Sequence, residues 1–311
     1  MKIFNEGVTF PQGFKAQGVE AGIKKPGIKD LAVIFSPTPC QAAGVFTTNK
    51  VQAACVQINK ELLKDGLAQA IVVNSGNANA CTGEPGRNDA YAMSALAAKY
   101  LNIAPEDVLT ASTGVIGVSL PMDRVNEGIT AACTSLTEEG GQNAALAIMT
   151  TDTIPKNIGI EMQLGGKTVR IGAMAKGSGM IHPNMATMLA FVTTDADISQ
   201  ECLQKALQDS TAISYNMISV DGDTSTNDMV LVLANGQAGN PTIKDAGSPE
   251  YAQFKEALDK ANTYLAKTIA RDGEGATRLI EVEVAGAVND MQARKVARSI
   301  IGSSLFKAAV F

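Results

Sequence analysis

The segment 176–190 carries the residue types of a hydroxyl nucleophile. A stretch interrupted by glycine and proline leads to the small residue Ala186, then to Thr187, and then to an apolar run of strand type. A threonine hydroxyl is a weak nucleophile unless a base lies beside it. Cleavage of the Ala186–Thr187 bond would place a new α-amine, which titrates near pH ~7.7–8.0 in model compounds, beside that hydroxyl. The pattern by itself favours an ordinary threonine at the start of a strand, and a self-activating threonine is the alternative.

The near-absence of histidine restricts the chemistry further. The chain has one histidine, His182, and no tryptophan, so a histidine-rich metal site is excluded and any histidine-based triad would need His182. The five cysteines are widely spaced and form no C-x-x-C pair, which argues against a zinc site and a disulfide framework. We therefore expect no metal, a base other than histidine, and a reducing, cytoplasmic compartment.

Two other motifs offer competing chemistry. Gly166-Lys167-Thr168 ends like a phosphate-binding loop, but Glu161 occupies the place of that motif's first glycine. The run 221–225 follows an apolar segment, as the aspartyl nucleophile of haloacid-dehalogenase-like phosphatases does, where an aspartate attacks phosphorus beside Mg²⁺. Ser225 stands where Thr or Val is usual in that family. A polar turn held by Asp, Ser and Thr side chains is the preferred interpretation.

Composition excludes several classes of protein. The chain has 26 Lys and Arg against 31 Asp and Glu, a net charge of −5, and no basic run, which argues against a nucleic-acid or anionic-membrane partner. No apolar run reaches the ~18 residues of a membrane span, and we expect no secretory signal. With 311 residues, 45% of them hydrophobic, the chain can bury a sizeable core and has a prior of about two domains.

The elements that must position these residues alternate between strands and helices. Short apolar runs predict strands, and alternation predicts a further one at 279–285. Gly165-Gly166 joins two extended runs and predicts a hairpin over 158–173, which argues against a purely parallel sheet. A predicted helix over 121–136 is expected to end near Gly140-Gly141. The other strands are predicted at 31–35, 70–73, 108–112, 188–193 and 229–234, and the other helices at 88–101, 199–212, 248–273 and 289–301.

Six stretches resemble the ornithine acetyltransferase family, whose members are also called bifunctional arginine biosynthesis proteins. The stretches occur in the family's order along nearly the whole chain, so a joint chance occurrence is implausible. They are Val72–Gly83, Ser112–Gly117, Met149–Thr153, Lys176–Leu189, Asp221–Asp228 and Arg271–Thr277.

The resemblance implies an Ntn-like acyltransferase that cuts itself between Ala186 and Thr187. Thr187 would then take the acetyl group of N2-acetyl-L-ornithine and pass it to L-glutamate. Thr113 and Gly114 match the family's oxyanion-stabilising positions, where a hydroxyl and a backbone N–H can meet the charge of a tetrahedral intermediate.

Four residues match the family's substrate-contacting positions: Thr150, Lys176, Thr187 and Glu274. A lysine there can bind a carboxylate and lower the pKa of a nearby amine, and a glutamate can pair with the ornithine ammonium. The alternatives without a functional role are that Lys176 is a solvated lysine in a loop and that Glu274 is a glutamate at the end of a helix. Under this resemblance the acidic loop 221–228 is structural.

The same resemblance implies an α/β fold, an Ntn-like layered sandwich of the aminopeptidase and ornithine acetyltransferase type. Residues 1–186 would form an α chain and residues 187–311 a β chain sharing its core. A smaller α/β C-terminal domain would be incomplete here, because family members continue past Phe311.

The implied partners are the small molecules N-acetylornithine and glutamate, with an α2β2 heterotetramer as the assembly. No cofactor is expected. Acetyl-CoA is a candidate second acetyl donor, and no motif in the sequence decides between one donor and two. An Ntn-type amidase or aminopeptidase using the same threonine, and an inactive truncated chain, are the alternatives.

Overall fold

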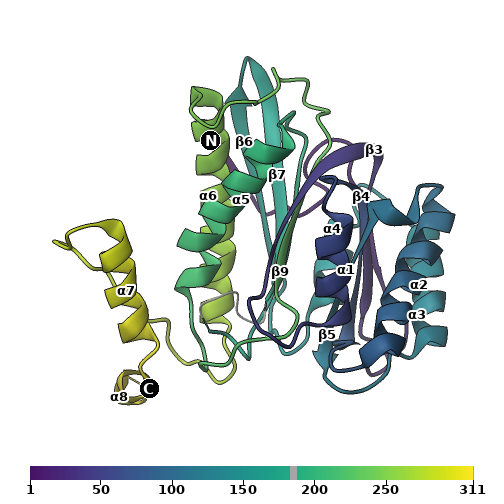
Figure 1. The fold of residues 1–311 in the computed structure, drawn as a ribbon, viewed down its shortest axis with the longest axis horizontal. Helices are drawn as coiled ribbons and strands as arrows, with labels where there is room; N and C mark the ends of the chain where they lie inside the picture. The colour runs from purple at the N-terminus through teal and green to yellow at the C-terminus, as the bar shows by residue number, and fades with distance from the viewer. Residues whose placement is uncertain (183–187, 311) are drawn as a thin grey trace.

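In the computed structural model, residues 1–182 and 188–310 are described. Their strands form one sheet in the order β1-β6-β7-β8-β9-β3-β4-β5, with β2 also paired to β3 (Figure 1). Most neighbours are antiparallel, and β4–β5 and β8–β9 are parallel. The strands are β1 (Lys2–Phe4), β2 (Lys15–Val19), β3 (Leu31–Phe46), β4 (Leu67–Asn77), β5 (Val108–Val115), β6 (Lys156–Leu164), β7 (Lys167–Lys176), β8 (Leu189–Thr194) and β9 (Met229–Ala234).

Strand β3 joins the two halves of the sheet, which we call half-sheets: β1, β6, β7, β8 and β9 on one side of it, and β2, β4 and β5 on the other. Its first part pairs with β2 and β4, and its last part, Gln41–Phe46, pairs with β9. The register shifts between Phe35 and Cys40, where Pro37 and Pro39 have no N–H to donate to a neighbouring strand. The interruption lets one long strand take part in two differently facing half-sheets.

Helices cover the outer faces of both half-sheets. Alternating side chains of β3 separate two cores, with Leu31 and Val33 on one side and Ala32 and Ile34 on the other. Helices α2 and α3 pack on the core that contains Leu31 and Val33, whereas α5 and α6 pack on the outer face of β6–β9. The helices are α1 (Ala54–Leu62), α2 (Gly83–Leu101), α3 (Met122–Thr134), α4 (Gly141–Ile148), α5 (Gln200–Ile213), α6 (Pro249–Arg271), α7 (Asp290–Ile301) and α8 (Ser304–Val310), with 3-10 turns η1 (Pro105–Asp107) and η2 (Tyr215–Met217).

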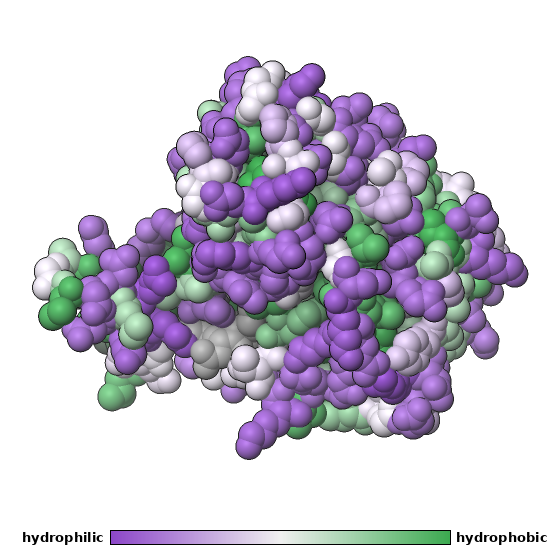
Figure 2. All heavy atoms as spheres, turned by 45° about the horizontal axis from the view of Figure 1, so that its top comes forward, coloured by the Kyte–Doolittle hydropathy of each residue, from purple (hydrophilic) through white to green (hydrophobic). Residues whose placement is uncertain are grey.

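The middle core lies between the half-sheets. It holds the inner faces of β3, β4, β8 and β9 together with the buried sides of α1 and α4. The result is the α/β layered sandwich that the family resemblance implies, with strands from both sides of residue 186 in one sheet. Figure 2 shows hydrophilic residues over most of one face and α7–α8 projecting from the main body.

Local signals explain many of the element boundaries. The Ser199 and Ser248 hydroxyls accept hydrogen bonds from the backbone N–H groups of Cys202 and Tyr251 and cap α5 and α6. Gly165 and Gly166 both have positive φ, +57° and +79°, as a tight hairpin turn between β6 and β7 requires. The predicted hairpin is therefore confirmed.

Two sequence predictions about elements were wrong. Gly140-Gly141 does not close a helix; it begins α4, and a Cβ on Gly140 would lie 1.8 Å from the Ala16 carbonyl oxygen, so close packing on β2 requires the glycine. Residues 279–285 alternate between half-buried and exposed positions but form no strand, and no described strand pairs with them. Alternation of apolar and polar residues indicates that one side of a segment is covered, but it does not show that a neighbouring strand is present to pair with the segment.

None of the helices in the described part of the chain combines the length and the apolar character needed to cross a membrane.

Candidate active site

Thr113 and Gly114 lie at the end of β5, beside the end of the parallel strand β4. Gly114 pairs with Gly76 in register and has φ +133°. A Cβ on Gly114 would lie 2.3 Å from the Gly76 carbonyl carbon and 2.5 Å from the Asn77 nitrogen. Only glycine fits this turn, which brings two backbone segments into direct contact.

Lys176 is the last residue of β7 and is almost completely buried. Its Nζ lies 3.4 Å from Thr113 Oγ1 and donates to it, so the structure brings these two predicted residues together. Burial is the main cause that lowers the pKa of Lys176, and the carboxylates of Asp152 and Asp228 oppose that shift. Lys176 pairs in register with Leu189 of β8, so its backbone lies opposite the strand that follows the predicted nucleophile.

The predicted nucleophile and scissile bond, Ala186–Thr187, lie outside the described residues. The residue that follows them is held by a buried acid: the Met188 N–H donates to Asp228 Oδ1 at 2.9 Å. Burial raises the pKa of Asp228 well above its usual value, and its Oδ2 has no hydrogen-bond partner in the described part of the chain. Sequence reasoning gave Asp228 no separate role, although it ends one of the six family-like stretches.

Thr150 and Glu274 come from two further segments. Thr150 is half-buried after α4, and its N–H donates to Asp152 Oδ2 at 3.0 Å. Glu274 follows α6 as an exposed residue, and its N–H donates to the Ser178 carbonyl at 3.0 Å. A Cβ on Gly179 would lie 2.5 Å from Glu274 Cδ, so the glutamate side chain rests on the loop that follows Lys176.

A buried ionic group, which we call the three-charge cluster (Asp152, Lys156 and Asp272), joins these segments. Lys156 Nζ lies 2.6 Å from Asp152 Oδ1 and 2.6 Å from Asp272 Oδ2. The side chains of Lys156 and Asp152 are 0% exposed and that of Asp272 is 7% exposed. Asp152 and Asp272 fall inside the family-like stretches, but the pairing of Lys156 with Asp272, 116 positions away, had no local signal.

The carboxylates of the three-charge cluster stay ionised because of their partners. Burial by itself would raise the pKa of Asp152, but the positive charges of Lys176 and Lys156 hold it below its usual value. Burial would also raise the pKa of Asp272, but hydrogen bonds from Lys156 and Thr153 outweigh the effect of burial and lower this pKa below its usual value.

Lys24 is a second cation near this site that sequence reasoning missed. Its Nζ donates to the carbonyls of Met149 and Lys29, and burial lowers its pKa to about 8. A Cβ on Gly76 would lie 3.0 Å from Lys24 Cγ, so the lysine stem lies over the glycine that supports Gly114.

The acidic loop 221–228 is a structural turn, as preferred from the sequence. Asp221 accepts hydrogen bonds from the N–H groups of Met180 and Ile181 and so anchors the loop after Lys176. Among the described residues no three acidic, histidine or cysteine side chains group as metal ligands do. His182 Nδ1 lies 3.2 Å from Ser219 Oγ. Gly166-Lys167-Thr168 lies in the β6–β7 hairpin, which is not the strand-to-helix context of a phosphate loop.

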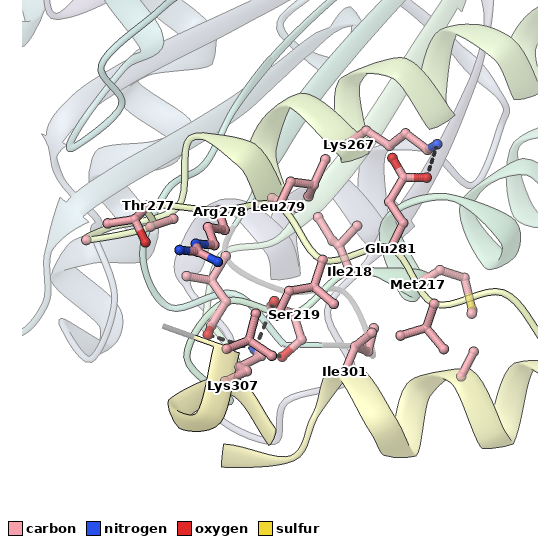
Figure 3. Close-up of a pocket in the computed structure, with 18 of the residues that line it drawn as sticks. Met217, Ile218, Ser219, Lys267, Thr277, Arg278, Leu279, Glu281, Ile301 and Lys307 are labelled. Atoms are coloured by element: carbon pink, nitrogen blue, oxygen red, sulfur yellow. Dashed lines mark hydrogen bonds and ion pairs between the residues drawn. The ribbon is translucent and has the colours of Figure 1, made fainter. Parts of the chain in front are cut away.

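A cavity of about 420 Å³ lies next to this centre, between η2, residues 274–282 and the helices α7 and α8 (Figure 3). Its lining is mostly apolar, Lys307 Nζ donates to the Ser219 and Val220 carbonyls, and Lys267 pairs with Glu281 at 2.8 Å. Of the predicted site residues that the structure describes, Glu274 lines it.

Comparison with known sequences gives a consistent result. The ArgJ family model matches residues 15–311. The arginine biosynthesis bifunctional protein ArgJ of Symbiobacterium thermophilum is 60% identical over 307 residues, which cover 98% of this chain and 76% of the relative. The protein named ArgJ 1 of Clostridium acetobutylicum is 54% identical over 307 residues, covering 99% and 75%.

Solved structures agree with both the fold and the sequence match. The ArgJ structure from Bacillus halodurans has a TM-score of 0.56 at 44% identity and covers 60% of this chain and 98% of its own. The ornithine acetyltransferase of Mycobacterium tuberculosis, solved with ornithine, has a TM-score of 0.55 at 40% identity and covers 58% and 97%. An l-aminopeptidase of Ochrobactrum anthropi with an Ntn hydrolase fold has a TM-score of 0.55 at 11% identity, covers 86% of each chain, and shows a shared fold alone.

Proposed function

Because the chain belongs to the ArgJ family, we propose that it transfers acetyl from N2-acetyl-L-ornithine to L-glutamate in arginine biosynthesis, through an acetyl-Thr187 intermediate. The observation that carries this proposal is the meeting of buried Lys176 with Thr113, 3.4 Å apart, beside the glycine turn and the start of β8. The solved relative that holds ornithine, at 40% identity, supports the choice of substrate.

Thr113 and Gly114 would stabilise the tetrahedral intermediate. Lys176 donates to Thr113 Oγ1, so the hydroxyl hydrogen of Thr113 remains available to an oxyanion. The Gly114 N–H would supply the second donor at the same turn. Removing one such donor typically costs about 10²–10³-fold in rate.

In the proposed reaction the α-amine of Thr187 takes the proton of its own hydroxyl, and Oγ attacks the acetyl carbonyl. The C–N bond to ornithine then breaks, and the departing α-amine receives the proton that the Thr187 amine held. Glutamate's neutral α-amine next attacks the ester carbonyl and gives one proton to the Thr187 amine. That amine passes the proton to Oγ as the ester C–O bond breaks, so the Thr187 hydroxyl is restored and N-acetylglutamate leaves. This sequence requires no cofactor or metal.

The charges of the site suit a substrate with a negative charge at one end and a positive charge at the other. Lys176 and Thr150 would bind the α-carboxylate, and Glu274 would pair with the terminal ammonium of ornithine. Lys176 is buried and Glu274 is exposed, so the carboxylate would enter deepest and the ammonium would stay near the mouth.

Maturation would cut the chain between Ala186 and Thr187 into an α chain of residues 1–186 and a β chain of residues 187–311. The Bacillus halodurans structure supports this, because 60% of 311 residues, about 187, accounts for 98% of that solved chain. The two products would stay together, since β7 of the first pairs with β8 of the second. We propose an α2β2 heterotetramer in the cytoplasm.

The relatives' name, bifunctional, supports a second acetyl donor. On this basis the chain would act as glutamate N-acetyltransferase and also as amino-acid N-acetyltransferase with acetyl-CoA. An assay with each donor in turn, glutamate being the common acceptor, distinguishes one activity from two.

The test of the central proposal combines intact-mass analysis, N-terminal sequencing and an acetyl-transfer assay. The wild type should give a fragment beginning at Thr187 and should gain the mass of one acetyl group with N2-acetylornithine. Thr187→Ala should stay one polypeptide and transfer nothing. Acetylation of glutamate by an uncut chain would refute the mechanism, and hydrolysis without transfer would favour an amidase.

A further inference from the structure

The three-charge cluster lies where three segments of the site meet. Asp152 is in the connection from α4 to β6, Lys156 begins β6, and Asp272 follows α6. Lys156 bridges the two carboxylates, at 2.6 Å from each. One ammonium therefore joins segments that are 116 positions apart in the sequence.

Asp152 holds the carboxylate-binding end of the proposed site. Its Oδ2 accepts the Thr150 N–H at 3.0 Å, and its Oδ1 accepts the N–H of Gly177, the residue after Lys176, at 2.6 Å. One buried side chain thus fixes the backbone at or beside both residues proposed to bind the carboxylate.

Asp272 holds the ammonium-binding end. Its carboxylate accepts the Thr153 N–H at 3.0 Å, and its carbonyl accepts the Ser178 hydroxyl at 2.6 Å. Two residues later, the Glu274 N–H donates to the Ser178 carbonyl at 3.0 Å. The position of Glu274 is therefore set by contacts that begin at Lys156.

General stability does not explain a buried charge cluster of this kind. Desolvation of buried ions offsets much of their attraction, and apolar side chains of similar volume often stabilise a core as well or better. Directional bonds to ionised groups do fix the relative positions of the segments that carry them. Here each fixed segment bears one of the residues proposed to contact substrate.

We propose that the three-charge cluster sets the separation between Lys176 and Glu274 and so selects the number of methylenes between the α-carboxylate and the terminal ammonium of the donor. Its members are positioning residues that touch no substrate. This inference rests on the proposed function, since it concerns the specificity of that same site.

The main test is Asp272→Asn, which keeps the side-chain size and removes the charge that faces Lys156. The kcat/KM values are measured for N2-acetylornithine and for the analogues one methylene longer and shorter, N2-acetyl-lysine and N2-acetyl-2,4-diaminobutyrate. One methylene is worth about 10–200-fold in a well-fitted pocket. We expect the variant's preference for ornithine to fall by about tenfold or more. A folding defect would lower all three values by the same factor.

Ser178→Ala is a milder second variant, which removes the bond to the Asp272 carbonyl and leaves the ionic contacts intact. Its preference should fall in the same direction by a smaller factor, and it decides the matter if Asp272→Asn does not fold. Glu256→Gln is the matched control on α6, where a surface pair with Lys260 at 2.7 Å is lost far from the cluster. It should keep the wild-type preference.

An unchanged preference in active Asp272→Asn, or in Ser178→Ala where the first is inactive, overturns the inference. A wild-type protein that transfers no acetyl from N2-acetylornithine would instead overturn the proposed function. The two failures are distinguishable, because the first is a ratio between substrates and the second is the absence of a reaction.

Discussion

Replacing Gly114 by alanine should disable the oxyanion turn. The new Cβ would lie 2.3 Å from the Gly76 carbonyl carbon, 2.5 Å from the Asn77 nitrogen and 2.6 Å from the Gly76 oxygen. All three atoms are backbone, so no side chain can rotate away. Ordinary contact begins at 3.4 Å, and the two strand ends must separate by about 1 Å.

The size of the effect follows from that displacement. A misplacement of about 1 Å can cost about 10²-fold in rate, and loss of one oxyanion donor costs about 2.7–4 kcal/mol of transition-state stabilisation. We expect kcat for acetyl transfer to fall at least about 10²-fold. The φ of +133° adds backbone strain on the order of 1–3 kcal/mol to the free energy of folding.

Gly117→Ala is the matched control. Gly117 lies in the same loop with φ +79°, and a Cβ added there would have no atom within 4 Å. The substitution should cost about 1–2 kcal/mol in stability through strain alone and leave kcat unchanged.

The assay pairs thermal unfolding with kcat per mature enzyme, the mature fraction being taken from denaturing electrophoresis. Gly114→Ala should lose cleavage, or transfer, or both, and Gly117→Ala neither. Wild-type cleavage and wild-type kcat in Gly114→Ala would refute the assignment of this turn.

Three further predictions concern pH. The pKa of Asp228 is raised, so above about pH 3.9 the unfolded chain releases this proton while the folded chain keeps it, and the contribution of Asp228 to stability is lost as pH rises. Asp228→Asn, whose amide oxygen still accepts the Met188 N–H, should be at least as stable as wild type at pH 8 in urea unfolding. A variant that loses more stability relative to wild type at pH 8 than at pH 4.5 would contradict this. Lys24, with a pKa of about 8, loses its charge as pH rises through 8, whereas Lys24→Arg keeps a positive charge there. The titration of the Thr187 amine is common to both proteins, so the kcat/KM for N2-acetylornithine of wild type relative to Lys24→Arg should fall above pH 8; identical profiles would speak against a role for this cation. The pKa values of Asp152 and Asp272 are lowered by folding, so the two ionised carboxylates contribute stability above about pH 3.9 that is lost as pH falls through their folded-state pKa values. The urea midpoint of the wild type should therefore fall in acid, and that of Asp272→Asn should fall by less over the same pH range.

Short-range patterns in the sequence determined much of this protein. The serine caps of α5 and α6, the Gly165-Gly166 turn and the apolar runs of β8 and β9 each act within a few residues, so a local window contains the whole cause. The family-like stretches likewise indicated the glycine turn at 113–114 and the lysine at 176. The hydroxyl and ammonium of these two stretches proved to lie 3.4 Å apart.

Only the tertiary structure decided the rest. The bend of β3, the place of α4 in the middle core and the irregular course of 279–285 depend on which segments pack together, and a window of sequence does not contain its partner. The same holds for the ionic contact of Lys156 with Asp272, 116 positions away, and for the hydrogen bond from Met188 to Asp228. Buried charges need partners in space, and the fold alone determines which charges become buried together.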